Sequence, residues 1–146
     1  MKEQLEIKVE LSIINLKQQN KIMKSIHLDK NIIASIPNNW GINIGQGGVS
    51  LFDPINGVGA VQFSFYTVHN PYSLNLADEL DEYLKDKYEN VQANLLGDLA
   101  YVSLVSSSGI LWRYWLLRKM SNIIFVSYNC KKEDIVDNII QSVAIK

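Results

Sequence analysis

Two long stretches of this chain carry almost no charge, and this feature limits what the chain can fold into. Between Asn31 and Ala77 the only fixed charge is Asp53, and residues 99–112 contain none. Strands that are covered on both faces have no wet face and lose the alternation of polar and apolar residues. The pattern therefore predicts a sheet that is shielded from water on both sides, by elements of the same chain or by another molecule.

The size and composition of the chain fit a single folded domain. It has 146 residues, of which 47% are hydrophobic and 20% charged, and roughly 100–200 residues per domain is usual. These values exclude a disordered or low-complexity chain. Lys and Arg number 14 against 15 Asp and Glu, so the basic surplus typical of a nucleic-acid-binding protein is absent. The single cysteine, Cys130, forms no internal disulfide, which fits a reducing compartment.

The start of the chain shows no secretory signal, and no apolar stretch approaches the length of a membrane span. We therefore expect a cytoplasmic protein with no membrane span, made of an N-terminal strand or extension over residues 1–24 and a single domain over residues 25–146. Residues 5–13 alternate between apolar and polar side chains, which favours a strand with one buried face. A helix remains the alternative, because Leu5, Val9, Ile13 and Leu16 also share one helical face.

The rest of the chain predicts an α+β fold, a mostly antiparallel sheet flanked by helices. Asn75 or Ser73 caps a first helix over residues 74–88, which has acidic residues in its first turn. A second helix is expected over residues 132–142. Short apolar runs separated by turn residues predict strands, at residues 32–36, 42–44, 49–52, 60–68, 99–105, 110–117 and 123–128.

The position of the two helices decides how the sheet is covered. In one interpretation both faces are covered within the chain, and charge is confined to helices and loop tips. In the other, both helices pack on one face, which leaves aromatic residues of the opposite face for a protein partner or a second copy. The residues of the hairpin 110–128 are apolar on both faces, with Trp112, Tyr114 and Leu116 on one and Leu111, Trp115 and Leu117 on the other.

The search for catalytic groups assigns no catalytic residue, metal site or cofactor. His27 and His69 have no second ligand at metal-binding spacing, and Cys130 is interpreted as structural. The glycine-rich segment 45–48 is followed by strand-like residues and has no Gly-Lys-Ser/Thr sequence, so we interpret it as a hairpin turn rather than a phosphate loop.

Basic residues lie among aromatic ones near the end of the chain. Aromatic rings with flanking arginines are able to stack nucleic-acid bases, but the overall charge favours an acidic protein partner. Trp, Tyr and Arg dominate protein-binding hot spots. The candidate partner-binding residues are therefore Trp112, Arg113, Tyr114, Trp115 and Arg118.

The order of the segments gives a resemblance to a known family. The chain has the run Ile36-Pro37-Asn38-Asn39-Trp40, then Gly57-Val58-Gly59-Ala60 before a strand, a helix, the turn Gly97-Asp98-Leu99-Ala100, and a terminal helix ending in Ile139-Ile140-Gln141-Ser142-Val143. Over residues 25–145 this order resembles the PsbP-like (Mog-like) fold of small bacterial domains. The resemblance implies an α/β/α sandwich that is not an enzyme. Similar members are mostly binding or assembly proteins, among them DcrB-like chaperones of type VI secretion effectors.

The sequence therefore favours a non-enzymatic, bacterial, cytoplasmic module that binds another protein, as a secretion-effector chaperone or a toxin immunity protein. The alternative is a small-molecule-binding domain or an enzyme, with a pocket near Trp40, Asp53 and His69. A structural homodimer is the third hypothesis.

Overall fold

The computed structural model describes residues 23–55, 59–129 and 133–146. The strand predicted over residues 5–13 and the interpretation of Cys130 lie outside the described residues. The elements follow one another along the chain as β1 (Met23–Asp29), β2 (Ile32–Pro37), β3 (Gly41–Gly45), β4 (Gly48–Phe52), β5 (Ala60–Thr67), the 3-10 turn η1 (Pro71–Ser73), α2 (Leu76–Leu84), β6 (Asn94–Leu96), β7 (Leu99–Val105), β8 (Leu111–Lys119), β9 (Asn122–Tyr128), α3 (Glu133–Ser142) and β10 (Ala144–Ile145).

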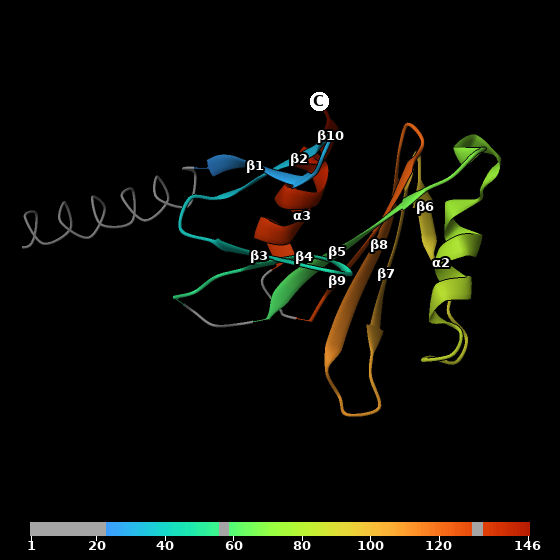
Figure 1. Cartoon of the computed structure of the whole chain (residues 1–146). Coiled ribbons are helices and arrows are strands. Elements are labelled where there is room, and N and C mark those ends of the chain that lie inside the picture. The colour runs from blue at the N-terminus through green and yellow to red at the C-terminus, as the bar shows by residue number, and fades with distance from the viewer. Residues whose placement is uncertain (1–22, 56–58, 130–132) are drawn as a thin grey trace, which may run out of the picture.

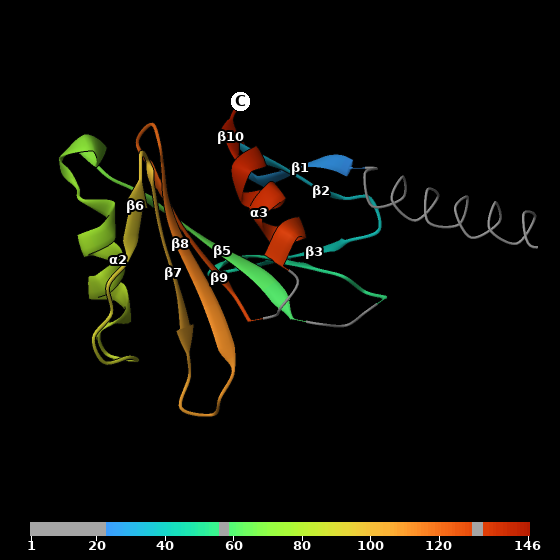
Figure 2. The same cartoon turned by 180° about the vertical axis from the view of Figure 1, so that it is seen from behind.

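The strands form two antiparallel sheets, and with the flanking helices they confirm the predicted α+β fold. The larger sheet has seven strands in the order β3-β4-β5-β9-β8-β7-β6, and the smaller has the order β1-β2-β10. The smaller sheet was not predicted, because its strand β10 pairs Ala144 with Ile33, far away in the sequence. Figures 1 and 2 show the large sheet in the middle, with α2 on one side and α3 with the small sheet on the other.

The two helices lie on opposite faces of the large sheet, so the interpretation that placed both on one face is wrong. We call these faces the α2 face and the α3 face. The side chains of β8 point alternately to the two faces, as predicted. Trp115 and Leu117 belong to the core under α3, whereas Tyr114 and Leu116 belong to the core under α2. Strand β8 is apolar on both faces because it contributes to both cores.

The helix α2 begins as predicted and ends earlier. The side chain of Asn75 accepts a hydrogen bond from the backbone N–H of Asp78 at 3.1 Å, which caps the first turn. The helix ends at Leu84 rather than at residue 88, because the N–H groups of Lys87 and Tyr88 both turn back to the Leu84 carbonyl. This short helix leaves Tyr88 outside it, in the turn that follows.

The helix α2 is too small to cover its whole face of the sheet. It contacts β6, β7 and β8 and buries Leu76, Leu80 and Leu84 there. The neighbouring strands β5 and β4 keep a wetter surface on this face, where Gln62 and Tyr66 are exposed and Ser64 is half-buried. The α2 face is therefore half core and half open surface.

Candidate functional site

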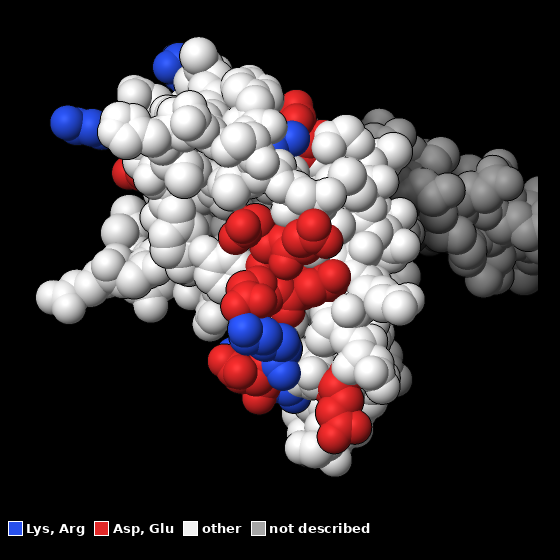
Figure 3. Space-filling model, turned by 90° about the vertical axis from the view of Figure 1, so that its right-hand side faces the viewer, with Lys and Arg blue, Asp and Glu red and all other residues white. Residues whose placement is uncertain are grey.

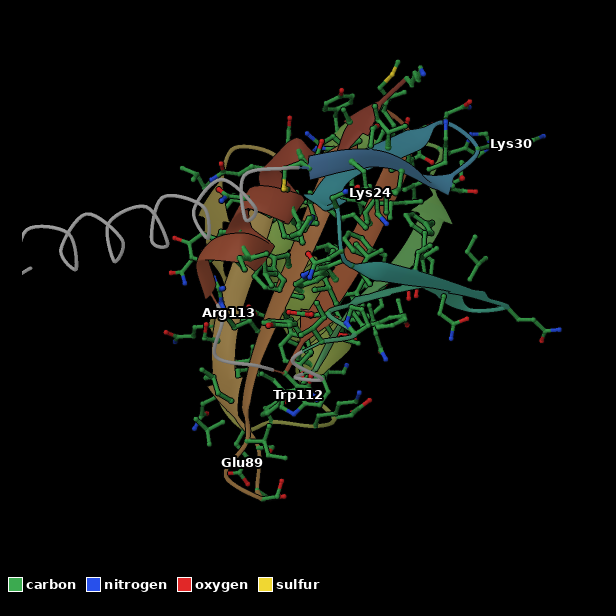
Figure 4. All side chains as sticks on the ribbon, turned by 90° about the vertical axis from the view of Figure 1, so that its left-hand side faces the viewer. Lys24, Lys30, Glu89, Trp112 and Arg113 are labelled. Atoms are coloured by element: carbon green, nitrogen blue, oxygen red, sulfur yellow. The ribbon has the colours of Figure 1, made fainter. Side chains whose placement is uncertain are left out.

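The five candidate partner-binding residues do not form one surface. Tyr114 and Trp115 are 4% and 3% exposed and pack into different cores. The guanidinium of Arg113 lies over the Trp115 ring, 4.7 Å from its centroid, and donates a hydrogen bond to Asp137 at 2.8 Å. Figure 4 shows Arg113 beside the lower end of α3. Of the five, Trp112 and Tyr114 line an open pocket, and the Trp112 ring is the less buried of the two.

The arginine at the other end of β8 also has internal partners. Arg118 donates hydrogen bonds to the carbonyl oxygens of Pro71 and Leu74, at 2.7 and 2.9 Å, and to the Asp98 carboxylate at 3.0 Å. With Arg113 and Arg118 both bonded inside the fold, the arginines of β8 do not form a surface for an acidic partner.

The three residues of the alternative pocket lie apart. Trp40 is 5% exposed and belongs to the core under α3. Asp53 follows β4 beside the start of β5, whereas His69 follows the end of β5, and eight strand residues separate these positions by about 25 Å. His69 instead lines a cavity of about 490 Å³ together with Tyr72 and Met120.

An open pocket of about 400 Å³ lies on the uncovered half of the α2 face. We call it the aromatic pocket. Its walls come from the segment after α2, with Lys87 and Tyr88, and from the β7–β8 hairpin, with Ser106 and Ser107. Its floor comes from β5, β8 and β9, and consists of Gln62, Ser64, Trp112, Tyr114, Phe125 and Ser127.

Aromatic rings form a continuous row across this floor and beyond it. Trp112 stacks on Tyr114 and Tyr114 on Phe125, each with 6.0 Å between ring centroids. The row continues from Phe125 to Tyr83 at 5.3 Å and from Tyr83 to Tyr66 at 6.0 Å. Tyr83 and Tyr66 are 42% and 45% exposed, so one end of the row lies on the open surface.

Polar groups on the floor are oriented toward the pocket. Ser127 is 8% exposed and lines the pocket, and its hydroxyl forms no hydrogen bond with any described residue. The Ser64 hydroxyl reaches the Gly47 carbonyl only weakly, at 3.4 Å. A buried hydroxyl normally finds a partner, so the Ser127 hydroxyl is available for a ligand or for water.

Two tyrosines close the inner end of the pocket. The hydroxyls of Tyr88 and Tyr114 lie 2.7 Å apart, and their rings meet edge to face. Burial, followed by the hydrogen bond with Tyr88, raises the pKa of Tyr114 well above its usual value of 10. Tyr114 therefore keeps its proton at neutral pH and acts in the pocket as a neutral ring rather than as a base.

This raised pKa gives a prediction for alkaline stability. Because the folded state holds the Tyr114 proton more tightly than the unfolded state, the free energy of unfolding is unaffected below about pH 10 and falls as pH rises above it. In Tyr114→Phe we expect a shallower fall between about pH 10 and 12, measured by urea unfolding. The same change at Tyr101, which is 39% exposed, serves as the control. Equal slopes in wild type and Tyr114→Phe would contradict the prediction.

The surface beside the pocket is acidic. Figure 3 shows acidic side chains grouped over α2 and the segment after it, with a few basic ones between them. Lys85 pairs with Glu82, and the Asp81 carboxylate accepts a hydrogen bond from the Ala93 N–H at 2.8 Å. The remaining acids of α2 and the segment after it are Asp78, Glu79, Asp86 and Glu89. The net negative charge favours a basic ligand beside the aromatic rings.

The sequence contained part of this site. It placed Trp112 and Tyr114 on one face of β8. Along β5, the polar residues Gln62, Ser64 and Tyr66 alternate with apolar ones. That polar side of β5 was the signal of an open face. The sequence analysis did not select Ser127, because its neighbours in β9 are apolar on both faces, which is typical of a buried strand.

Two further findings concern metals and membranes. Within residues 23–55, 59–129 and 133–146, no three His, Cys, Asp or Glu side chains lie close enough together to hold a metal ion. No helix in the same part of the chain is both long and apolar enough to cross a bilayer.

Comparisons with known proteins identify the fold. No protein-family model matches the chain, and no curated protein matches it. A crystal structure of a protein from Bacteroides thetaiotaomicron VPI-5482 is similar with a TM-score of 0.59 and 14% identity, over 82% of this chain and 47% of that one. The chain thus spans about half the length of that protein.

The solution structure of cyanobacterial PsbP (CyanoP) from Synechocystis sp. PCC 6803 is similar with a TM-score of 0.53 and 10% identity. This match covers 85% of this chain and 92% of that one. At these identities the likeness shows the fold alone. The chain has a PsbP-like fold, which confirms the resemblance seen in the sequence at the level of the fold.

Proposed function

We propose that this protein is a non-enzymatic module that binds an extended segment of a partner protein in the aromatic pocket. The observation that carries the proposal is the row of five aromatic rings in contact, beside the Ser127 hydroxyl, which has no hydrogen-bond partner among the described residues. None of the described residues that line the pocket carries a carboxylate or an imidazole, which supports binding rather than acid–base catalysis.

The spacing of the rings fits an extended chain. Neighbouring centroids in the row are 5.3 to 6.0 Å apart. In a strand-like extended segment the rise is about 3.3 Å per residue and alternate side chains point the same way, so they recur about every 6.6 Å. Recognition of extended segments through pockets for alternate side chains is a recurring binding mode. Alternate apolar side chains of the partner would rest on successive rings, while Ser127 and Gln62 bond to its backbone.

The acidic residues beside the pocket indicate which residues flank the bound segment of the partner. The aromatic pocket adjoins the acidic surface of α2 and the following turn, where Glu82, Asp86 and Glu89 lie. Complementary charge speeds association and selects partners. We expect Lys or Arg next to the apolar residues of the bound segment, which replaces the acidic partner expected from the arginines of β8.

We also propose a chaperone or immunity role for the module, depending on its partner. A partner that is a secretion effector or a toxin would make this protein a chaperone or an immunity protein of the bacterial cytoplasm. Support for these roles comes from the resemblance of the sequence to the PsbP-like fold, whose members include DcrB-like chaperones.

The test uses the full chain and an array of synthetic decapeptides. The peptides alternate Pro, Leu or Tyr with small residues and carry either Lys or Glu at the flanks. We expect the Lys-flanked peptides to bind more tightly. Trp112→Ala should weaken this binding roughly 10- to 30-fold, the effect of removing a hot-spot aromatic residue. Tyr101→Ala, on the α3 face of β7, is the matched control and should bind as the wild type does.

Several outcomes would overturn the proposal. No peptide bound above background, or equal binding by Trp112→Ala and wild type, would remove the pocket as a peptide site. A small molecule that raises the melting temperature of the wild type but not of Trp112→Ala would assign the pocket to a small ligand instead. The melting temperature of each variant without ligand shows whether it is folded.

A further inference from the structure

The edge strand β3 differs from the other sheet edges of the molecule. It pairs with β4 and with no other strand of the described residues, and neither β3 nor β4 contains a charged residue. Natural proteins protect sheet edges by short strands or charged side chains. The edges β6 and β10 have only three and two residues, and β1 carries Lys24, His27 and Asp29. The strand β3 has neither kind of protection.

The apolar side chains of β3 lie on the surface. Ile42 and Ile44 are 38% and 71% exposed. Their register partners on β4, Leu51 and Val49, are 0% and 4% exposed and belong to the core under α3. Residues in register share a face of the sheet, so the two isoleucines continue the apolar floor of that core out to an edge where nothing described covers them.

The sequence of β3 is the same in both directions. It reads Gly41-Ile42-Asn43-Ile44-Gly45. An antiparallel pair of two such strands, related by a two-fold axis at Asn43, places glycine opposite glycine, isoleucine opposite isoleucine and asparagine opposite asparagine. A two-fold interface brings the same patch of both copies together, and here it pairs apolar side chains with apolar ones.

We propose that β3 pairs with β3 of a second copy of this chain, which joins the two large sheets into one continuous antiparallel sheet across a two-fold axis. Ile42 of each copy lies opposite Ile44 of the other, so four isoleucines form one apolar strip on the α3 face. The two Asn43 amides meet on the opposite face. The backbone N–H and C=O groups that β3 turns away from β4 bond to those of the partner.

The size of this contact sets the strength of the association. Two strands of five residues bury less than the roughly 1,200 Å² of a stable interface. We therefore expect a weak dimer, mostly monomeric at about 10 µM and substantially dimeric near 1 mM, as is common for contacts below that area. The aromatic pocket is formed by β5, β8 and β9 on the α2 face, whereas the isoleucines of β3 lie on the α3 face, so we expect this interaction to be independent of partner binding.

The test measures the mass of the full chain by sedimentation velocity from about 10 µM to 1 mM, a range chosen for a weak interface. Ile44→Lys places a charge on the edge and should keep the protein monomeric throughout. Ile55→Lys makes the same change at a residue that is 76% exposed in a turn and should dimerise as the wild type does. Trp112→Ala should also leave the dimer unchanged.

Any of three results would overturn the proposal. The first is a wild type that stays monomeric up to 1 mM, and the second is an Ile44→Lys variant that dimerises as readily as Ile55→Lys. The third is slow exchange of the amide hydrogens of Ile42 and Ile44 at every concentration. The last result would show that the edge is already paired within one copy. Under the proposal, exchange at these two amides slows as concentration rises, and the slowing is absent in Ile44→Lys.

Discussion

Replacing Gly48 with alanine should lower the free energy of unfolding by about 3 kcal/mol, the sum of a strained backbone and an overpacked contact. Gly48 opens β4 with a φ of +152°, a conformation that side chains disfavour. A Cβ atom there would overlap the backbone carbonyl oxygen of Phe63 on the neighbouring strand β5. Because the overlapping atom belongs to the backbone, no side-chain rotation removes the clash. The strand β4 would have to move away from β5.

The adjacent glycine provides the matched control. A Cβ atom at Gly47 would meet nothing within 4 Å, so Gly47→Ala should change the free energy of unfolding by less than about 0.5 kcal/mol. Urea unfolding of both variants measures the difference. If Gly48→Ala is as stable as Gly47→Ala, the close approach of β4 to β5 described here is contradicted.

The sequence predicted the elements of the fold because their signals are local. The Asn75 cap, the strand at residues 99–105 and the division of β8 between two faces all depend on residues that are near each other in the chain. Each matches the structure, although α2 ends at Leu84 because the turn after it competes with a further helical turn.

The arrangement of those elements depends on contacts that the sequence does not encode locally. The residues around Ala144 give no sign that it pairs with Ile33. The sequences of α2 and α3 likewise do not indicate which face of the sheet each helix covers. The prediction that charge-free strands are shielded from water on both sides holds where the two cores lie, but it fails at the β3 edge and on the open half of the α2 face. The pattern is also equally consistent with helices on one face or on both. The face of each helix follows from the path of the connecting segments.

The candidate site was predicted in part, and for a similar reason. Trp112 and Tyr114 were selected by residue type, and they do line the aromatic pocket. Arg113 and Arg118 were selected in the same way, but their partners Asp137 and Asp98 lie 24 and 20 residues away. An arginine that serves a surface and one that is bonded inside the fold look alike in sequence, and only the fold distinguishes them.

Replacing Arg118 with methionine should lower the free energy of unfolding by about 2–3 kcal/mol, because it removes two charge-assisted hydrogen bonds to part-buried carbonyl oxygens. The guanidinium, on a side chain that is 12% exposed, binds the carbonyl oxygens of Pro71, which begins η1, and of Leu74, which follows η1 and precedes α2. It thereby fixes the start of α2 against β8. Methionine preserves the length and apolar contacts of the side chain but donates no hydrogen bond.

The ion pair with Asp98 contributes little to this effect, because the Asp98 side chain is 60% exposed and surface pairs are weak. Asp98→Asn should therefore cost much less than Arg118→Met. Lys119→Met is the matched control, since it removes the same charge from the next residue of β8 and should cost less than about 0.5 kcal/mol. Urea unfolding measures all three variants. Equal costs for Arg118→Met and Lys119→Met would show that charge, rather than the two carbonyl bonds, explains the role of Arg118.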